Sequence, residues 1–389
     1  MKFDFDTPTD RHNTDSYKWD DTIDEDILPM WVADMDFRTA PCIIDALRRR
    51  VDHGVFGYTK VPERYFDATR QWFATRHGLN IDRSLMLYTS GVVPALSATI
   101  KALTKPGDAV LVQTPVYNCF FSSIRNNGCK IVENPLHYAD GYYTIDFDDL
   151  DRKLAQKDVK LMLLCNPHNP GGRVWTPDEL RHVAQLCRKH GVMVVSDEIH
   201  CEIVFPPYKY TPFASLGEEE AAICVTCSSP SKAFNTAGLQ IANIFAPNAE
   251  VRDAIDRAIN INEVCDVNPF GVIALIAAYT EGAEWLGEMV SYLHDNYRTL
   301  TMFMESELPM LGVTHLEGTY LAWIDCRNLG MDSDDIEKRL RDEDRVWVNS
   351  GTMYGEAGQG FIRINMACPR TRLLEGLRRF KQGIESFIA

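Results

Sequence analysis

Short apolar runs alternate with helix-like patterns between residues 84 and 229. The strand-like runs cover 84–91, 109–115, 129–135, 159–165, 192–200 and 222–229. Several of them are almost continuously apolar, as expected of parallel strands that are covered on both faces. Strands that alternate with helices in this way predict an α/β fold, with a mostly parallel sheet flanked by helices.

The helix predicted after the fourth of these strands has well-marked ends. Thr176 and Glu179 have the spacing of a capping box, and Pro177 suits the first helical position. Gly191 stands where a helix-ending glycine belongs. The pattern therefore predicts a helix between Thr176 and Gly191.

The pattern changes after about residue 284. A long helical stretch runs to Leu308, the run 314–326 alternates like a half-buried strand, and an amphipathic helix ends the chain. We therefore expect a large domain at 48–284 and a smaller α+β domain at 285–389. Residues 1–47 are expected to form an N-terminal arm and part of the small domain.

Charge and apolar content exclude several classes of function. Lys and Arg total 40 against 55 Asp and Glu, a formal charge of −15, which argues against binding to a nucleic-acid backbone. The N-terminus is acidic and polar, and the most apolar stretch, 270–279, is too short to span a bilayer. We therefore expect a cytoplasmic protein that binds neither nucleic acid nor membrane.

The eleven cysteines are scattered, and we expect free thiols rather than a disulfide framework. One C-x-x-C pair, Cys224 and Cys227, lies in a predicted strand. Residues three apart in a strand face opposite sides, so this pair does not predict a metal site.

Polar residues follow four of the predicted strands, in "TSGVV" (89–93), "CNPHNPGG" (165–172), "SDEIH" (196–200) and "SSPSK" (228–232). In a doubly wound sheet, ligands bind beyond the carboxyl ends of the strands. The four strand ends therefore predict one shared binding crevice.

Three residues in these strand ends suggest a particular cofactor. Lys232 has apolar neighbours, and burial makes a lysine amine a nucleophile that forms Schiff bases. Asp197 ends an apolar strand, where a carboxylate needs a partner such as a cationic heterocycle. The amide of Asn169 could hold a phenolate oxygen. Taken singly, these residues also fit a solvated lysine, a helix-capping aspartate and a turn asparagine, but together they predict pyridoxal 5′-phosphate (PLP).

A phosphate site is predicted from the turn at 90–93, before the helix expected at 94–108. The backbone of Ser90, Gly91, Val92 and Val93 could donate to a phosphate at the start of this helix. Hydroxyl groups in the stretch 228–231 could add further donors.

The ordered motifs "SGVV", "TPVY", "NPHNPGG", "SDEIH", "SSPSK" and "FIRIN" resemble those of the fold-type I PLP enzymes, the aspartate aminotransferase superfamily. The resemblance covers nearly the whole chain. Within that superfamily, "LPMWVADMDF" (28–37), "FGYT" (56–59) and "KAFNTAGLQ" (232–240) are similar to the MalY/PatB-type cystathionine β-lyases, or cysteine C–S lyases.

The resemblance implies a role for each residue of the site. Lys232 would bind the cofactor covalently and move the substrate Cα proton, Asp197 would pair with the ring nitrogen, and Tyr117 would stack on the ring. The other residues implied to contact the cofactor are Gly91, Val92, Val93, Asn169, His200, Ser229, Ser231 and, from the neighbouring subunit of a homodimer, Tyr58.

The resemblance also implies the substrate side. Arg363 would bind the α-carboxylate with a bidentate fork, assisted by Asn169, while Ala33 and Asp34 would line the pocket. The implied reaction is α,β-elimination from L-cystathionine or a related L-cysteine S-conjugate, giving a thiol, pyruvate and ammonia.

Two positions depart from related patterns. Gln240 stands where many aminotransferases have a phosphate-binding arginine, which favours the lyase branch, and Ala95 replaces a glycine common in the lyases. The alternatives are an aminotransferase on the same fold and a PLP-binding regulatory protein.

Overall fold

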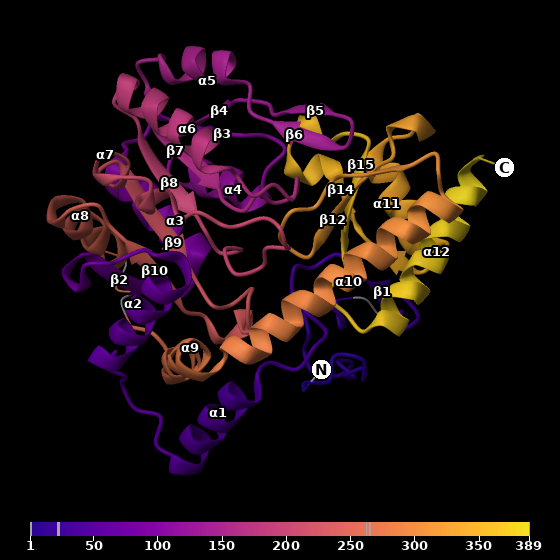
Figure 1. Ribbon diagram of the computed structural model, residues 1–389, viewed down its shortest axis with the longest axis horizontal. Helices are drawn as coiled ribbons and strands as arrows, with labels where there is room; N and C mark the ends of the chain where they lie inside the picture. The colour runs from indigo at the N-terminus through magenta and orange to yellow at the C-terminus, as the bar shows by residue number, and fades with distance from the viewer. Residues whose placement is uncertain (1, 22–23, 262, 264–265, 389) are drawn as a thin grey trace.

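The computed structural model describes residues 2–21, 24–261, 263 and 266–388. Its central sheet has seven strands, six of them parallel to one another (Figure 1). In spatial order they are β2 (Met86–Thr89), β10 (Ala242–Phe245), β9 (Cys224–Ser228), β8 (Met193–Asp197), β7 (Val159–Cys165), β3 (Ala109–Val112) and β4 (Lys130–Glu133). Within this sheet only β10 runs antiparallel to its neighbours. The predicted mostly parallel α/β fold is confirmed.

Alternate residues of the central strands enter two separate cores. In β7, Leu161 and Leu163 pack in one cluster with α3 (Val92–Leu103), α4 (Asn118–Asn126) and α8 (Ala249–Asn260). Met162 and Leu164 pack in the other with α5 (Phe147–Leu154) and α6 (Pro177–His190). Helices therefore cover both faces of the sheet, which explains the continuous apolar runs.

Three further helices lie below the central sheet in Figure 1: α1 (Pro41–His53), α2 (Glu63–His77) and α9 (Pro269–Glu281). The short α7 (Glu218–Ala221) lies at the left of the sheet. Helix α9 packs against both α1 and α2.

The predicted ends of α6 are confirmed. Thr176 and Glu179 form a reciprocal capping box, Pro177 is the first helical residue, and Gly191 ends the helix with a left-handed φ of 66°. The two residues of the C-x-x-C pair enter opposite cores, Cys224 in one and Cys227 in the other.

The C-terminal part contains a second, antiparallel sheet. Its order is β11 (Gly312–Val313), β12 (Leu321–Asp325), β15 (Phe361–Asn365) and β14 (Asn349–Ser350), and it is accompanied by α10 (Ala283–Glu307), α11 (Ser333–Asp342) and α12 (Arg370–Ile388). The half-buried strand predicted at 314–326 is wrong in detail. Only 321–325 form a strand, and Leu321–Ile324 are wholly buried because Trp323 enters one core and its neighbours enter another.

The N-terminal segment joins the C-terminal part through β1 (Leu28–Pro29), which pairs in parallel with β13 (Val346–Trp347). A hairpin of β5 (His137–Ala139) and β6 (Tyr142–Thr144) completes the strands. The predicted domain boundaries stay predictions. The boundary at 47 falls inside α1, and the boundary at 284 falls next to Ala283, the first residue of α10. Among the described residues, no helix is long and apolar enough to cross a membrane.

Candidate active site

A cavity of about 460 Å³ opens at the carboxyl ends of β2, β7, β8 and β9. The four polar strand ends singled out in the sequence meet there, as predicted. The predicted site residues that line the cavity are Ala33, Gly91, Val92, Val93, Tyr117, Asn169, Asp197, His200, Ser231, Lys232 and Arg363.

Lys232 follows β9, and its amine points toward the segment that forms the opposite wall. Lys232 Nζ donates a hydrogen bond to the carbonyl oxygen of Ala33 at 2.6 Å, and the Tyr320 hydroxyl donates to the same oxygen at 2.9 Å. Burial, reinforced by the positive charge of Arg363, lowers the pKa of Lys232 to about 8. The neutral, nucleophilic form of this amine is therefore far more populated near neutral pH than in an exposed lysine.

Asp197 is the last residue of β8 and is buried in the floor of the cavity. Its carboxylate accepts the backbone N–H of Ile199 at 3.1 Å. Burial, with repulsion from Glu198 added to it, raises the pKa of Asp197 to about 7. A cationic ring nitrogen placed against this carboxylate would favour its charged form.

His200 lies near Asp197 and is neutral, because burial lowers its pKa to about 3. Its Nδ1 atom is buried without a hydrogen-bond partner among the residues that the structure describes. Buried polar atoms normally have partners. His200 therefore has hydrogen-bonding capacity that a ligand in the cavity could use.

Arg363 lies in the middle of β15 with only 3% of its surface exposed. Its Nη1 donates to Asn169 Oδ1 at 3.2 Å and its Nη2 to the Trp31 carbonyl at 2.8 Å. The guanidinium also lies 4.9 Å from the ring centre of Tyr354. A buried guanidinium that has no carboxylate partner among the described residues suits an anionic substrate group.

The start of α3 suits a phosphate. The helix begins at Val92 with Gly91 as its N-cap, and no side chain of the described residues caps it. Its first N–H groups are therefore directed toward the cavity end of β2, where the helix dipole favours an anion. Ser231 lies in the same cavity.

Three predicted residues do not line the cavity. Ser229 Oγ donates to the Ile241 carbonyl at 2.6 Å, and Tyr58 is fully exposed between α1 and α2. The prediction that Asp34 lines the substrate side is wrong for its side chain. The Asp34 carboxylate forms an ion pair with Arg11 at 2.7 Å, because its two cationic neighbours, Arg11 and Lys18, lie on the side of residues 31–37 that faces away from the cavity.

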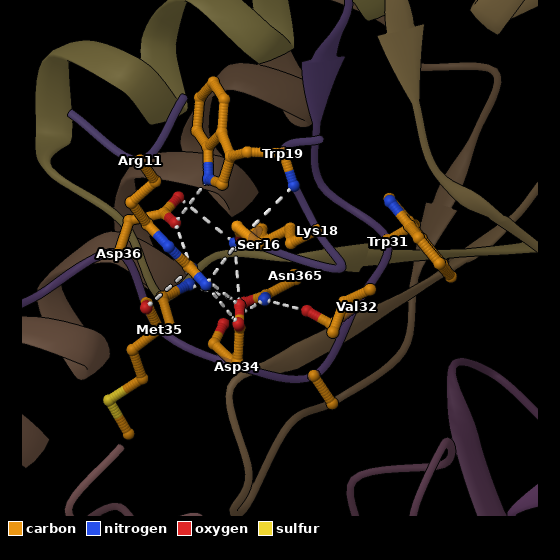
Figure 2. Close-up of polar contacts among 12 residues, drawn as sticks. Arg11, Ser16, Lys18, Trp19, Trp31, Val32, Asp34, Met35, Asp36 and Asn365 are labelled. Carbon is orange, nitrogen blue, oxygen red and sulfur yellow. Dashed lines mark hydrogen bonds and ion pairs between the residues drawn. The ribbon is translucent and has the colours of Figure 1, made fainter. Parts of the chain in front are cut away.

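The 31–37 segment, which carries Ala33, is fixed by polar contacts from distant parts of the chain (Figure 2). Asn365 Nδ2 donates to the carbonyl of Asp34 at 2.6 Å, and the Asn235 side chain bonds Met35 through both its amide atoms. Behind the segment, Asp36 is buried among Arg11, Lys18 and Arg372. The cavity wall is therefore held by charges that lie outside the cavity.

Sequence reasoning missed several residues that line the cavity. Trp31 and Cys119 could have been found, because each lies two residues from a predicted site residue, Ala33 and Tyr117 respectively. Tyr354 and Met353 come from a turn after β14 that carries no local signal.

Comparisons with known proteins agree with this geometry. Residues 25–380 match the family model described as aminotransferase class I and II. The chain belongs to the aminotransferase class I and II family. It is 42% identical to cystathionine beta-lyase PatB of Bacillus subtilis, over 98% of this chain and 99% of that protein. It is 37% identical to protein MalY of Escherichia coli, over 96% and 97% of the two chains.

A solved structure shows the same arrangement of the whole chain. The structure of cystalysin from Treponema denticola, which contains a pyridoxal 5′-phosphate cofactor, superimposes with a TM-score of 0.96 at 36% identity and covers 99% of this chain and 100% of that one. The fold-type I architecture predicted from the motifs is thus confirmed.

The side chains in the cavity fit PLP. The buried amine of Lys232, with its lowered pKa, suits the aldehyde of PLP. The buried carboxylate of Asp197, with its raised pKa, suits the ring nitrogen, and the start of α3, which no described side chain caps, suits the phosphate. His200 Nδ1 supplies a further buried polar atom without a partner among the described residues.

Proposed function

We propose that this protein is a PLP-dependent carbon–sulfur lyase. It would cleave L-cystathionine, or a related L-cysteine S-conjugate, by α,β-elimination to a thiol (homocysteine), pyruvate and ammonia. The observation that carries the proposal is that Lys232, Asp197 and Arg363 line one cavity, close enough for both charges to affect the pKa of the Lys232 amine. Full-length similarity to PatB supports the choice of reaction within the family.

Bound PLP supplies an electron-poor ring that accepts the electron pair left when the substrate Cα–H bond breaks. Asp197 would hold the ring nitrogen in its protonated form, and Asn169 and His200 would contact the ring oxygen. Tyr117 would stack on the ring; burial raises the pKa of its hydroxyl, so that the hydroxyl keeps its proton. Ser229 would support the phosphate site indirectly, through its hydrogen bond with Ser231.

Arg363 would orient the substrate by its α-carboxylate, with Trp31 and Asn169 fixing the guanidinium. Lys232, released from the cofactor, would take the Cα proton on Nζ. The Ala33 carbonyl, which already accepts from Nζ, would hold the ammonium beside the substrate. That ammonium could then return the proton to the departing thiolate.

We also infer a homodimer in which Tyr58 of one subunit contacts the phosphate held by the other. The support is the exposure of Val55, Phe56 and Tyr58 on the segment between α1 and α2, where three apolar or aromatic side chains meet solvent in one chain. Light scattering is expected to give twice the mass of one chain. A cytoplasmic location stays a prediction.

The deciding experiment is incubation of the purified holoenzyme with L-cystathionine, without any 2-oxo acid. Homocysteine, pyruvate and ammonia should appear in equal amounts, and Lys232→Ala should form none of them and lose the visible absorbance of bound cofactor. Amino-group transfer that depends on a 2-oxo acid, with no thiol released, would show an aminotransferase instead. Gln240, which lines the cavity in place of an arginine, argues against that outcome.

A further inference from the structure

A second cavity, of about 450 Å³, adjoins the proposed active site. Trp31, Asn349 and Met353 line both cavities, so the two share a wall. The Trp31 carbonyl accepts hydrogen bonds from Arg363 Nη2 at 2.8 Å and from Asn349 Nδ2 at 2.9 Å. The backbone that separates the cavities is therefore tied to the guanidinium proposed to bind the substrate carboxylate.

The second cavity presents both signs of charge on one helix. Asp334, Glu337 and Arg341 of α11 all line it, and they lie three and four residues apart, on one face of the helix. Arg341 Nη1 lies 3.2 Å from Glu337 Oε1. Asp334 is held in place by the hydroxyls of Ser350 and Thr352, which donate to its Oδ1.

An apolar surface adjoins these charges, because the Arg341 guanidinium lies 5.6 Å from the centre of the Trp347 ring. The rings of Trp31 and Trp347 stack with their centres 4.4 Å apart and their planes at 18°. In Figure 2 the Trp31 ring points away from the ion-pair network behind the 31–37 segment. A chain of methylene groups that leaves the active site past Trp31 would pack against these indoles.

We propose that the second cavity binds the amino-acid head of the leaving thiol. The ligand class is a zwitterionic α-amino acid group at the far end of an L-cysteine thioether or disulfide. Its ammonium would lie at Glu337 and Asp334, its carboxylate at Arg341, and its methylene chain along Trp31 and Trp347. The inference rests on the proposed lyase activity and refines it, because it makes substrates with an amino-acid group at both ends the preferred ones.

The charges give the reason for this choice. A plain alkyl leaving group would fill the apolar part of the second cavity and leave Glu337 and Arg341 without a new partner. A zwitterion matches two carboxylates and one guanidinium at once, with charge-assisted hydrogen bonds. Discrimination between substrates therefore arises from groups far from the bond that breaks.

The test compares two substrates, L-cystathionine and S-ethyl-L-cysteine, which share the cysteine half and differ in the head. The proteins are the wild-type holoenzyme, Glu337→Gln and Arg341→Met. Each variant should lose roughly tenfold to hundredfold in kcat/KM for L-cystathionine, mainly through KM, since each removes a charged hydrogen bond. For S-ethyl-L-cysteine the change should stay within about twofold.

Asp335→Asn is the matched control, because Asp335 is exposed on the same helix and does not line the second cavity. It should leave both substrates unchanged. Thermal midpoints and visible cofactor absorbance would verify that every variant is folded and loaded.

Two results would overturn the assignment while the lyase proposal stands: equal losses for both substrates, or wild-type kcat/KM for L-cystathionine in both variants. If the wild type released thiol from neither substrate, the lyase proposal would fail, and the assignment with it.

Discussion

Replacing Asp36 by asparagine tests the charged network behind the 31–37 segment. Asp36 is 1% exposed and accepts from Arg11 at 2.9 Å, Lys18 at 3.1 Å and the indole N–H of Trp19 at 2.9 Å, with Arg372 at 3.6 Å. Burial alone would raise its pKa, but Lys18, Trp19 and the two arginines outweigh burial and hold the pKa below 3.8. Asp36 is therefore charged near neutral pH.

The asparagine keeps the shape and removes the charge. Lys18, itself 1% exposed, would keep Asp34, at 3.5 Å, as its one counterion within the part of the chain that the structure describes. Loss of one partner from a buried ion pair costs about 3 to 5 kcal/mol. With an unfolding entropy of about 2.1 cal/mol/K per residue, or roughly 0.8 kcal/mol/K for the whole chain, the thermal midpoint should fall by about 4 to 6 °C if the chain unfolds as one unit.

The assay is thermal unfolding by circular dichroism across a pH series. A carboxylate whose pKa is lowered by folding stabilises the protein above its unfolded pKa, and this contribution is lost as the pH falls through the folded value. The difference between wild type and Asp36→Asn should thus be constant near neutral pH and shrink below pH 3.8.

Asp45→Asn is the control, because its ion pair with Arg48 is exposed and should contribute little. If Asp36→Asn melted within about 1 °C of wild type at pH 7, the network would contribute no net stability, and the cost assigned to uncompensated buried charge would be refuted.

Three further predictions concern the cavity. Cofactor-free protein should regain visible absorbance with PLP at a rate that rises as the pH increases through about 8, because the neutral amine of Lys232 is the reacting form; a flat profile would contradict this. Asp197→Ala should keep that absorbance yet lose at least a hundredfold in turnover; near-normal turnover would exclude it as partner of the ring nitrogen. Arg363→Ala should lower kcat/KM by a factor equivalent to about 2 to 4 kcal/mol of transition-state binding, since the substrate carboxylate loses its bidentate hydrogen bonds to the guanidinium. An unchanged kcat/KM would show that Arg363 does not bind the substrate.

Much of the site was predictable because its residues follow strand ends. The order of strands and helices fixes where parallel strands end, so Asp197, Asn169 and Lys232 could be brought together from the sequence. The apolar runs of the central sheet were equally clear, since both faces are covered and alternation is absent.

The parts that sequence reasoning missed depend on contacts between distant segments. Asp34 was predicted to line the cavity, but Arg11 and Lys18, far from any motif, hold its carboxylate on the other side. The alternating pattern of 314–326 predicts a half-buried strand, whereas two different cores cover the faces of the strand at 321–325. The second cavity was not foreseen, since α11 carries an ordinary surface pattern.

The way the 31–37 segment is held also constrains when the site can form during synthesis. Ala33 leaves the ribosome early, but the groups that fix its neighbours, Arg363 and Asn365, are made more than three hundred residues later. An unfinished chain therefore lacks one wall of the pocket, even when its central sheet is complete. Competence to bind substrate arises only once residues 363–365 have been translated and folded against this segment.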